Sequence, residues 1–184
     1  MKRCGAVLLL ALAAMPGEAR ARAPVPPDSA AVVALISGAP NAACPLPGVA
    51  TAGQPDSAQL VALGRAGVRR VIDLRVPDEA RGFDEVALAK AAKLHYVNLP
   101  VTAATLSNTT FDRFRRLMKH APRTGVLVHC HSGNRVGAVM IPWLVLDRGW
   151  DIERAVTAAK AGGLKSPVFE EKARAYVAAR ARRS

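Results

Sequence analysis

The stretch "GVLVHCHSGNRVGAVM", residues 125–140, joins an apolar run to an apolar segment of helical length through a short polar loop. Such a pattern predicts a strand before the loop and a helix after it. A cysteine at this junction faces the unpaired backbone N–H groups and the positive end of the helix, and both favour thiolate over thiol. Cys130 is therefore a candidate nucleophile.

The loop after Cys130 has the composition of an anion-binding cradle. Gly133 permits the tight backbone that turns successive N–H groups inward. Arg135, at the start of the predicted helix, offers a planar pair of donors suited to two oxyanion oxygens at once. The residues expected to bind substrate are His131, Ser132, Gly133 and Asn134.

Taken singly, these side chains have structural alternatives. A buried cysteine is usually an inert small hydrophobe. His129 could satisfy a hydrogen bond in the core, and Arg135 could be an ordinary charge on a helix surface. Their combination after a strand and before a helix favours a reactive loop instead.

Strand-like and helix-like segments alternate around this loop. The predicted helices span residues 56–67, 84–93, 106–120, 135–149, 151–162 and 167–181, and the predicted strands span residues 68–75, 95–101 and 125–129. If residues 135–149 form one helix, Pro142 should kink it. The alternation indicates an α/β fold with a mostly parallel central sheet, helices on both faces and active residues at the carboxyl ends of the strands.

The N-terminal segment has the pattern of a targeting sequence. Residues 1–21 combine a basic head, a short apolar run and small residues around a cleavage point, which indicates a secretory signal peptide. A membrane anchor is the alternative, but the apolar run ends too early to span a bilayer comfortably. We interpret residues 22–40 as a flexible leader and residues 41–184 as one domain. The expected location is periplasmic or secreted, without stable membrane insertion after cleavage.

The net charge of the chain indicates which partners it could bind, and its cysteine content indicates whether disulfides could stabilise it. Removing residues 1–21 takes away three basic residues and one acidic residue, so the formal net charge falls from +12 to +10. A basic protein favours anionic partners such as phosphorylated groups. The basic C-terminal tail contains Tyr176 as its single aromatic residue, so we expect no nucleic-acid binding. Cys44 and Cys130 alone remain after cleavage, which is too few for a disulfide-stapled scaffold.

A metal or cofactor is not expected. His129, Cys130 and His131 are adjacent, but on an extended chain the two histidines point one way and the cysteine the other, so the three cannot readily share one ion. The sequence contains no paired Cys-x-x-Cys motif and no Gly-x-x-x-x-Gly-Lys loop.

Several motifs together resemble those of a known family. They are "TAGQP" at 51–55, "GVRRVIDLRVPDE" at 67–79, "HYVNLPV" at 95–101, "HCHSGNRVGA" at 129–138 and "AKAGGL" at 159–164. The sequence is similar here to the bacterial branch of the cysteine-dependent dual-specificity phosphatases, the beta-lactamase-hydrolase-like phosphatase domain. The resemblance covers most of residues 45–165 and implies the three-layer fold of tyrosine phosphatase-like enzymes.

The resemblance also implies a phosphocysteine mechanism and a phosphorylated protein or small molecule as substrate. Cys130 would attack phosphorus, the loop N–H groups and Arg135 would hold the equatorial oxygens, and water would then hydrolyse the thiophosphate. His129 would stabilise the thiolate from behind. The catalytic group predicted in this way is Cys130, Arg135 and His129.

The sequence departs from the phosphatase pattern in three places. Four residues separate Cys130 from Arg135 where the signature has five, and Val136 stands where Ser or Thr is usual. The segment after "HYVNLP" also has no aspartate to act as general acid. The candidates for a substitute acid are Asp78, Glu79 and Asp84, although each fits a solvated turn or a helix cap better, and His131 is a weaker candidate.

Two other functions remain open at this level. The four-residue spacing resembles that of rhodanese-type sulfurtransferases, in which Cys130 would carry a persulfide and no general acid would be needed. A silent phosphate-binding module also fits the departures. Cys44 could protect Cys130 as a reversible disulfide partner if the two lie close together. Substrate identity and oligomeric state are not encoded in any motif.

Overall fold

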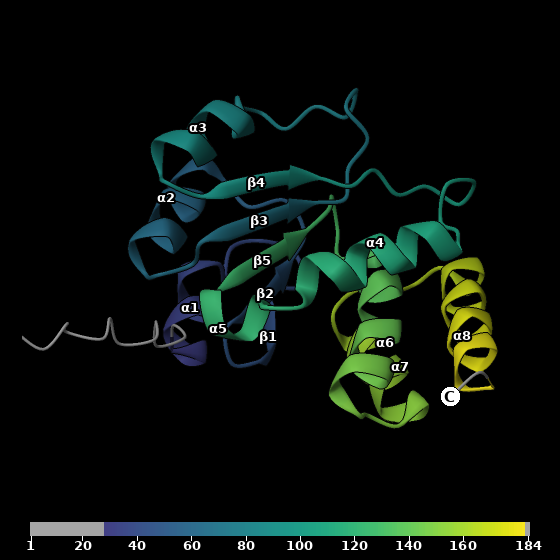
Figure 1. The fold of residues 1–184 in the computed structure, drawn as a ribbon. Coiled ribbons are helices and arrows are strands. Elements are labelled where there is room, and N and C mark those ends of the chain that lie inside the picture. Colours follow the sequence, from purple (N-terminus) through teal and green to yellow (C-terminus); the bar gives the residue numbers. More distant parts are fainter. Residues whose placement is uncertain (1–27, 183–184) are drawn as a thin grey trace, which may run out of the picture.

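The computed structural model describes residues 28–182, and its centre is a five-stranded sheet (Figure 1). The strands are β1 (Ala43–Leu46), β2 (Val49–Ala52), β3 (Arg70–Asp73), β4 (His95–Asn98) and β5 (Val126–His129). Their order is β1-β2-β5-β3-β4, with β1 antiparallel to β2 and the other neighbours parallel. The predicted mostly parallel α/β sheet is therefore confirmed. The carboxyl ends of β3, β4 and β5 meet at one edge.

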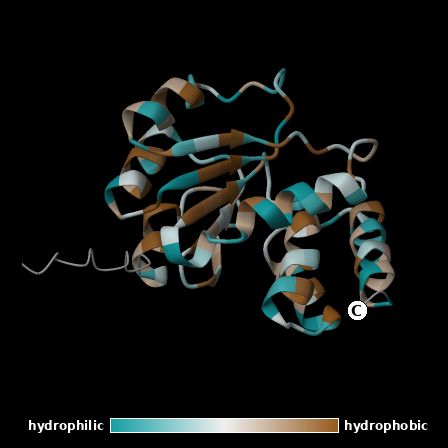
Figure 2. Ribbon diagram, in the orientation of Figure 1, coloured by the Kyte–Doolittle hydropathy of each residue, from teal (hydrophilic) through white to brown (hydrophobic). Residues whose placement is uncertain are grey.

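Helices cover both faces of the sheet. The helices are α1 (Ser29–Leu35), α2 (Ser57–Arg65), α3 (Glu85–Ala91), α4 (Asn108–Met118), α5 (Ala121–Thr124), α6 (Asn134–Arg148), α7 (Ile152–Ala161) and α8 (Pro167–Ala181). One buried cluster joins the sheet to α1, α2 and α3, and a larger one joins it to α4, α6, α7 and α8. Figure 2 shows the hydrophobic colour concentrated on the strands between these layers.

Alternation along β5 decides which face each side chain occupies. Leu127 belongs to the cluster under α1, α2 and α3, whereas Val126 and Val128 belong to the opposite cluster. Because successive side chains of a strand point to opposite faces, His129 lies on the same face of the sheet as Leu127. Cys130 is part of the cluster on the α6 side.

The sequence predicts helices α2, α3, α4, α6, α7 and α8, but neither α1 nor α5. Asp56 and Gln59 form a reciprocal capping box at the start of α2, which fixes that end of the helix. Helix α6 runs without interruption from Asn134 to Arg148 with Pro142 inside it. Its first residue follows Gly133, whose φ of 87° lies in the left-handed region.

The structure differs from the prediction at the N-terminal side. Residues 28–40 are not a free leader, because Val32 in α1 (2% exposed) and Ile36 at its C-cap (0% exposed) pack against the sheet. Asp28 caps this helix. The helix was not predicted because its neighbouring residues are rich in Pro and Ala and few of its residues are large and apolar. The β1–β2 hairpin was also not predicted. Its turn contains Gly48, which has a φ of 76°.

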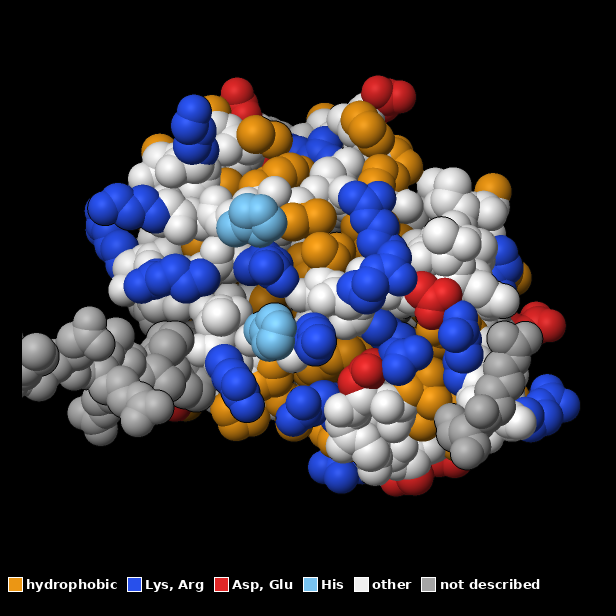
Figure 3. All heavy atoms as spheres, in the orientation of Figure 1, with side chains coloured by type: hydrophobic (Ala, Val, Ile, Leu, Met, Phe, Trp, Pro, Cys, Tyr) orange, Lys and Arg blue, Asp and Glu red, His pale blue; other side chains and the backbone are white. Residues whose placement is uncertain are grey.

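The predictions of a signal peptide and of no stable membrane insertion concern other features of the chain. The predicted signal peptide, residues 1–21, lies outside the described residues. Between residues 28 and 182, no helix is long and apolar enough to cross a membrane. Lys and Arg side chains are spread across the face shown in Figure 3, whereas few Asp or Glu side chains are visible there.

Candidate active site

The loop from Cys130 to Gly133 connects the end of β5 to the start of α6, at the edge where the parallel strands end. Cys130 is fully buried, and its Sγ accepts a hydrogen bond from the backbone N–H of Gly133 at 3.1 Å. The sulfur thus lies inside the turn, facing at least one backbone donor. This is the geometry expected of a nucleophilic cysteine in an anion cradle.

Neighbouring segments hold the loop from outside. The backbone N–H of Gln54 donates to the carbonyl oxygen of His131 at 3.1 Å, and Asn41 Nδ2 donates to the carbonyl oxygen of Ser132 at 2.8 Å. In a trans peptide the N–H points away from the C=O of the same unit. Fixing these two carbonyls outward therefore turns the N–H groups of Ser132 and Gly133 inward.

Close backbone approaches explain two of the motif glycines. A Cβ on Gly133 would lie 2.3 Å from the carbonyl oxygen of Gly162, and one on Gly53 would lie 2.6 Å from that of His131. The "TAGQP" and "AKAGGL" motifs therefore touch the cysteine loop directly. Asn134 completes the connection, since its Oδ1 accepts from the backbone N–H groups of Lys165 (2.8 Å) and Ser166 (3.1 Å).

Arg135 is held by Glu79 through both terminal nitrogens. Nη1 donates to Oε1 at 2.5 Å and Nη2 donates to Oε2 at 2.8 Å. Glu79 also accepts from Arg75 Nε at 3.1 Å and from the backbone N–H of Val76 at 3.0 Å. The hydrogen bonds from Arg135, ahead of the other contacts, lower the pKa of Glu79 to about 2, although burial opposes them.

The same contact stabilises the charged form of Arg135. Its pKa is raised, first by the hydrogen bonds to Glu79 and then by the nearby Cys130, although burial lowers it. A guanidinium has five N–H donors. Two bind Glu79 and a third, on Nη1, lies 3.5 Å from the Leu74 carbonyl oxygen, so Nε–H and one Nη2–H remain for Cys130, with which the guanidinium also interacts, and for substrate. These two parallel donors form one edge that suits two substrate oxygens.

The three carboxylates predicted as substitute acids occupy different environments. Glu79 is ionised near neutral pH by its contact with Arg135 and has no proton to give. Asp84 is exposed and caps α3 by accepting from the backbone N–H of Ala87 at 2.9 Å, and Asp78 is an exposed turn residue. The structure therefore brings only Glu79 to the cysteine loop through a side-chain contact. A general-acid role for Asp78 or Asp84 stays a prediction.

His129 and His131, on either side of Cys130 in the chain, lie in different environments. His131 is exposed beside the cradle, whereas His129 is fully buried on the α3 side. His129 Nε2 lies 2.8 Å from Glu85 Oε1 and 3.9 Å from Asp73 Oδ1. The first pair is close but not aligned as a hydrogen bond, and neither imidazole nitrogen has another partner.

A polar cluster surrounds the buried residues Asp73, Glu85 and His129, and of its members only His129 was predicted from the sequence. Its members are Gln54, Asp73, Arg75, Arg81, Glu85, Tyr96 and His129. Within it, Gln54 of the "TAGQP" motif joins Arg75 of the "GVRRVIDLRVPDE" motif to helix α3. Its Oε1 accepts from Arg75, and its Nε2 donates to Glu85 at 3.1 Å. The available signal was Asp73, a charged residue within the apolar strand "VIDL".

The same cluster contains the described residues closest to a metal-ligating set. One ligand atom each from Asp73, Glu85 and His129 lie within 4.8 Å of one another, and all three side chains are buried. Arg81 already binds Asp73 at 2.6 Å and lies 3.7 Å from Glu85. A guanidinium therefore supplies positive charge where a cation would bind.

Cys44 does not lie within disulfide reach of Cys130. Cys44 belongs to β1, where its Sγ donates to the carbonyl oxygen of Leu46 at 3.2 Å. Strand β2 lies between β1 and β5. Two strand spacings separate the two chains by about 10 Å, whereas a disulfide requires Cα atoms within roughly 7 Å. Both cysteines are free, and the sequence hypothesis of a Cys44–Cys130 switch is not supported.

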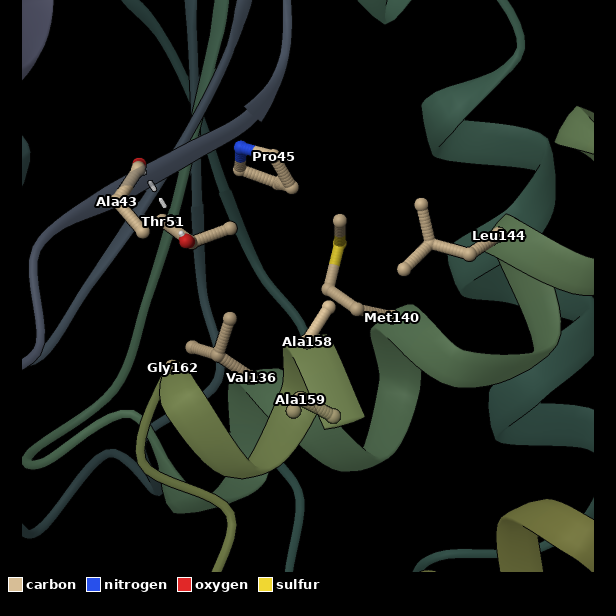
Figure 4. Close-up of a pocket in the computed structure, with 10 residues that line it drawn as sticks. Ala43, Pro45, Thr51, Val136, Met140, Leu144, Ala158, Ala159 and Gly162 are labelled. Atoms are coloured by element: carbon tan, nitrogen blue, oxygen red, sulfur yellow. Dashed lines mark hydrogen bonds between the residues drawn. The ribbon is translucent and has the colours of Figure 1, made fainter. Parts of the chain in front are cut away.

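A separate apolar crevice lies between the β1–β2 hairpin and helices α6 and α7 (Figure 4). Pro45, Met140 and Leu144 are among its lining residues, and its volume is about 40 Å³. Its lining is almost entirely apolar and does not include Cys130, Gly133 or Arg135. The crevice is therefore distinct from the cysteine loop.

Comparison with known proteins agrees with this geometry. Residues 48–175 match the family model PTP-NADK, described as a DSP-PTPase phosphatase fused to NAD+ kinase. This chain belongs to the PTP-NADK family. The matched range contains Gln54 and Glu79 as well as the loop with Cys130 and Arg135.

A curated relative is similar to this PTP-NADK member over part of its length. The chain is 28% identical over 137 residues to the beta-lactamase hydrolase-like protein of Xylella fastidiosa (strain Temecula1), covering 65% of this chain and 32% of that protein. The chain thus spans about a third of the length of this curated relative. The resemblance found in the sequence motifs is confirmed.

Solved structures show the same fold. A DUF442 protein from Shewanella putrefaciens CN-32 matches with a TM-score of 0.66 at 22% identity, over 80% of this chain and 97% of that one. TpbA from P. aeruginosa matches with a TM-score of 0.56 at 23% identity, over 70% of this chain and 77% of that one. The three-layer phosphatase-like fold predicted for the PTP-NADK chain is therefore confirmed.

Proposed function

We propose that this member of a cysteine-dependent phosphatase family hydrolyses phosphate monoesters through a phosphocysteine on Cys130. The observation that carries the proposal is the buried Sγ within the loop, bonded to the Gly133 N–H, with Arg135 in the first turn of α6. A thiolate at this position faces the donors that would bind the phosphoryl oxygens.

The reaction has two balanced steps. The Cys130 thiolate attacks phosphorus, a P–S bond forms, and the ester P–O bond breaks with its electron pair leaving on the alcohol oxygen, which takes a proton from solvent. Water then attacks phosphorus, the P–S bond breaks, and inorganic phosphate and the thiolate are released. The inward N–H groups of Ser132 and Gly133 and the free edge of Arg135 hold the oxygens in both steps.

The proposed substrate is an aryl phosphate such as phosphotyrosine. TpbA, one of the structural neighbours, has been solved in complex with pTyr. In this chain the loop "VTAATLSN", residues 101–108, contains no carboxylate, and Glu79 is committed to Arg135. A phenolate leaves without a protonated partner more readily than an alkoxide, because a phenol is the stronger acid.

The loop length favours a second candidate, a rhodanese-like sulfurtransferase. Four residues separate Cys130 from Arg135, so the cradle is shorter than the usual phosphatase loop. A persulfide on Cys130 would need no general acid. A silent phosphate-binding module is the third function that remains open.

Parallel assays of one preparation separate these functions. Purified protein is incubated with an aryl phosphate and, separately, with thiosulfate plus cyanide. Phosphate release without thiocyanate formation is the expected result. Thiocyanate alone would replace the proposal with sulfur transfer, and no product in either assay together with bound inorganic phosphate would leave the binding module. Cys130→Ser is the negative control and Cys44→Ser the matched control, since Cys44 lies two strands away.

We also propose a periplasmic or secreted location, supported by the basic head and apolar run of residues 1–21. Expression of the full chain followed by fractionation and N-terminal sequencing should recover a product that begins near residue 22. An uncleaved protein in the cytoplasmic fraction would contradict the proposal.

A further inference from the structure

The end of the molecule at the amino ends of the strands carries basic side chains that the proposed reaction does not use. Six exposed residues define this surface, which we call the basic belt: Arg65, Arg69, Lys93, Arg116, Lys119 and Arg123. Lys and Arg side chains follow this side of the molecule from α2 and α3 to α4 and α5 (Figure 3). The cysteine loop lies at the opposite edge of the sheet, because it follows the carboxyl end of β5.

The fold explains why these cations gather at one edge. Helices α2, α3 and α5 each end shortly before the amino end of a strand, namely β3, β4 and β5. The helix dipole favours cations at helix C-termini. Arg65 and Arg123 lie in the last turns of α2 and α5. Several helix ends therefore bring their basic residues to the same edge of the sheet.

Five of the six cations line two hollows. Arg65, Arg69 and Lys93 line the first hollow, between the ends of α2 and α3, which has a volume of about 450 Å³. Arg116 and Lys119 line the second hollow, between α4 and α6, which has a volume of about 420 Å³. Each hollow thus presents two or three cations from different parts of the chain.

Contacts at the start of β3 join the two hollows. Arg70 follows Arg69 in the chain, and its Nη1 donates to the carbonyl oxygen of Leu117 in α4 at 2.6 Å. The backbone N–H groups of Arg69 and Arg70 donate to the carbonyl oxygen of Gly125, which follows α5. The belt is therefore one continuous surface.

The belt is almost free of negative charge. Residues 86–146 include one acidic residue, Asp112, which is held by Arg180. Asp147, the other carboxylate at the second hollow, is held by Arg115. Between residues 28 and 182, no carboxylate forms an ion pair with any of the six belt cations. The helix dipole favours cations at helix ends but does not require this exclusion of acidic residues.

The side chains of the belt fit an anionic lipid surface. Among residues 28–182 the exposed large hydrophobic side chains are Val86 and Val168, and neither belongs to the belt. The belt therefore has no aromatic platform of the kind that stacks on single-stranded nucleic acid. It also has no apolar wedge that would enter a bilayer. It offers charge alone, which suits the array of phosphate groups on an anionic membrane.

We propose that the basic belt docks the protein on an anionic lipid surface, with the cysteine loop facing away from the bilayer. Strand β5 separates the two ends of the molecule, since the four steps from Val126 to Cys130 span about 13 Å. The proposed export of the chain favours lipid over nucleic acid as the polyanion that it meets. The inference does not depend on the reaction at Cys130, so the two proposals can fail separately.

Vesicle sedimentation tests the docking directly. The purified full chain is mixed with vesicles of phosphatidylcholine and phosphatidylglycerol and, separately, with vesicles of phosphatidylcholine alone, which measure any binding by residues 1–21. Binding should be stronger to the anionic vesicles. The excess should disappear as salt rises from about 0.1 M to about 1 M, because screening shortens the reach of the charges. Equal binding to both kinds of vesicle would contradict the proposal.

Charge-neutralising variants test whether the belt carries the binding. Arg116→Gln with Lys119→Gln should weaken binding to anionic vesicles about 25-fold, at about 5-fold for each cation near an anionic bilayer. Arg65→Gln with Lys93→Asn should weaken it by a similar factor, since these residues belong to the other half of the belt. Asparagine suits the positive φ of Lys93, which is 58°.

A matched control separates the belt from net charge. Lys160→Gln with Arg182→Gln removes the same charge from two exposed positions outside the belt and should weaken binding less than about 3-fold. An equal loss in this control, or normal affinity in either belt variant, would overturn the proposal. Circular dichroism and thermal unfolding check that each variant is folded.

Competitors identify the anion. Duplex DNA or inorganic phosphate is added at the phosphate concentration of the lipid, and most of the protein should stay on the vesicles. Release by DNA would overturn the proposal in favour of nucleic acid, and release by inorganic phosphate would reduce the belt to a site for a single ion. Cys130→Ser should bind the vesicles as the unmodified chain does, which keeps this result separate from the phosphatase assays.

Discussion

His129 and Arg135, the two basic side chains on either side of the cysteine loop, are held in opposite ways. His129 is fully buried beside Glu85 on the α3 side of the sheet. The side chains of Arg135 and Glu79 retain 15% and 25% exposure, and Arg135 keeps one edge of its guanidinium free. Arg135 can therefore bind substrate while it remains paired with Glu79. His129 is buried and cannot contact substrate directly.

Replacement of the nucleophile should have the largest effect. Cys130→Ser keeps the size of the side chain but loses the thiolate, so activity should fall to background. Cys44→Ser should retain most activity because β2 separates Cys44 from the loop. Initial rates of both variants provide the test. Comparable losses from both would mean that the two thiols act together, against the strand order.

Arg135→Lys should have the next largest effect. Lysine keeps the positive charge but cannot bind Glu79 and two substrate oxygens at once. We expect kcat to fall about 10²- to 10³-fold, as when a donor to a transition-state oxygen is lost. The measurement is kcat at saturating aryl phosphate, with thermal unfolding as a check on the fold. A near-normal rate would show that Arg135 is only a surface charge.

Glu79→Gln should weaken the contact that holds Arg135, the more exposed of the two basic side chains. Arg135 would lose its charged partner, and we expect kcat/KM to fall about 10-fold. The variant also has a pH signature in stability. Because the pKa of Glu79 is lowered from 4.5 to about 2, the ion pair stabilises the folded state above pH 4.5, and that contribution is lost as the pH falls towards about 2.

Denaturant titrations of the unmodified chain and Glu79→Gln at several pH values check this signature. The difference in the free energy of unfolding should be constant above pH 5 and shrink between about pH 4.5 and 2. A difference that grows on acidification would contradict the direction of the pKa shift. Asp78→Asn, in the same turn but exposed, is the matched control.

Tyr96→Phe should have the smallest effect and belongs to the buried side. The phenol donates to Asp73 Oδ2 at 2.7 Å, and Arg81 binds the same oxygen. Loss of this hydrogen bond should lower the free energy of unfolding by about 1 kcal/mol and change kcat/KM by less than about 2-fold. A large loss of activity at unchanged stability would place Tyr96 in the reaction and break the distinction between the two sides.

The sequence predicts the parts of the fold whose signals are local. The helix that starts near Asp56, the apolar run of β5 and the glycine before α6 each depend on signals within a few residues, and all are confirmed. Helix α1 was missed because two buried residues, Val32 and Ile36, stand in a Pro- and Ala-rich segment. Its stability comes from packing against the sheet and not from local propensity.

The site divides in the same manner. Cys130, Gly133 and Arg135 are close in sequence, so their spacing was enough to predict the cradle. The partners of its basic residues come from distant segments, and no local pattern showed that Glu79 would pair with Arg135 or Glu85 with His129. Such contacts depend on strand order and loop conformation, which follow from the whole fold.

The most direct test of the central claim is a search for the covalent intermediate. The chain is mixed with an excess of aryl phosphate, quenched in acid within the first turnover and digested, and the peptide that contains Cys130 is examined by mass spectrometry. The account predicts one added phosphoryl group on Cys130, absent in Cys130→Ser and in unreacted protein. Phosphate release with the phosphoryl group on another residue, or with no protein adduct at any quench time, would contradict it.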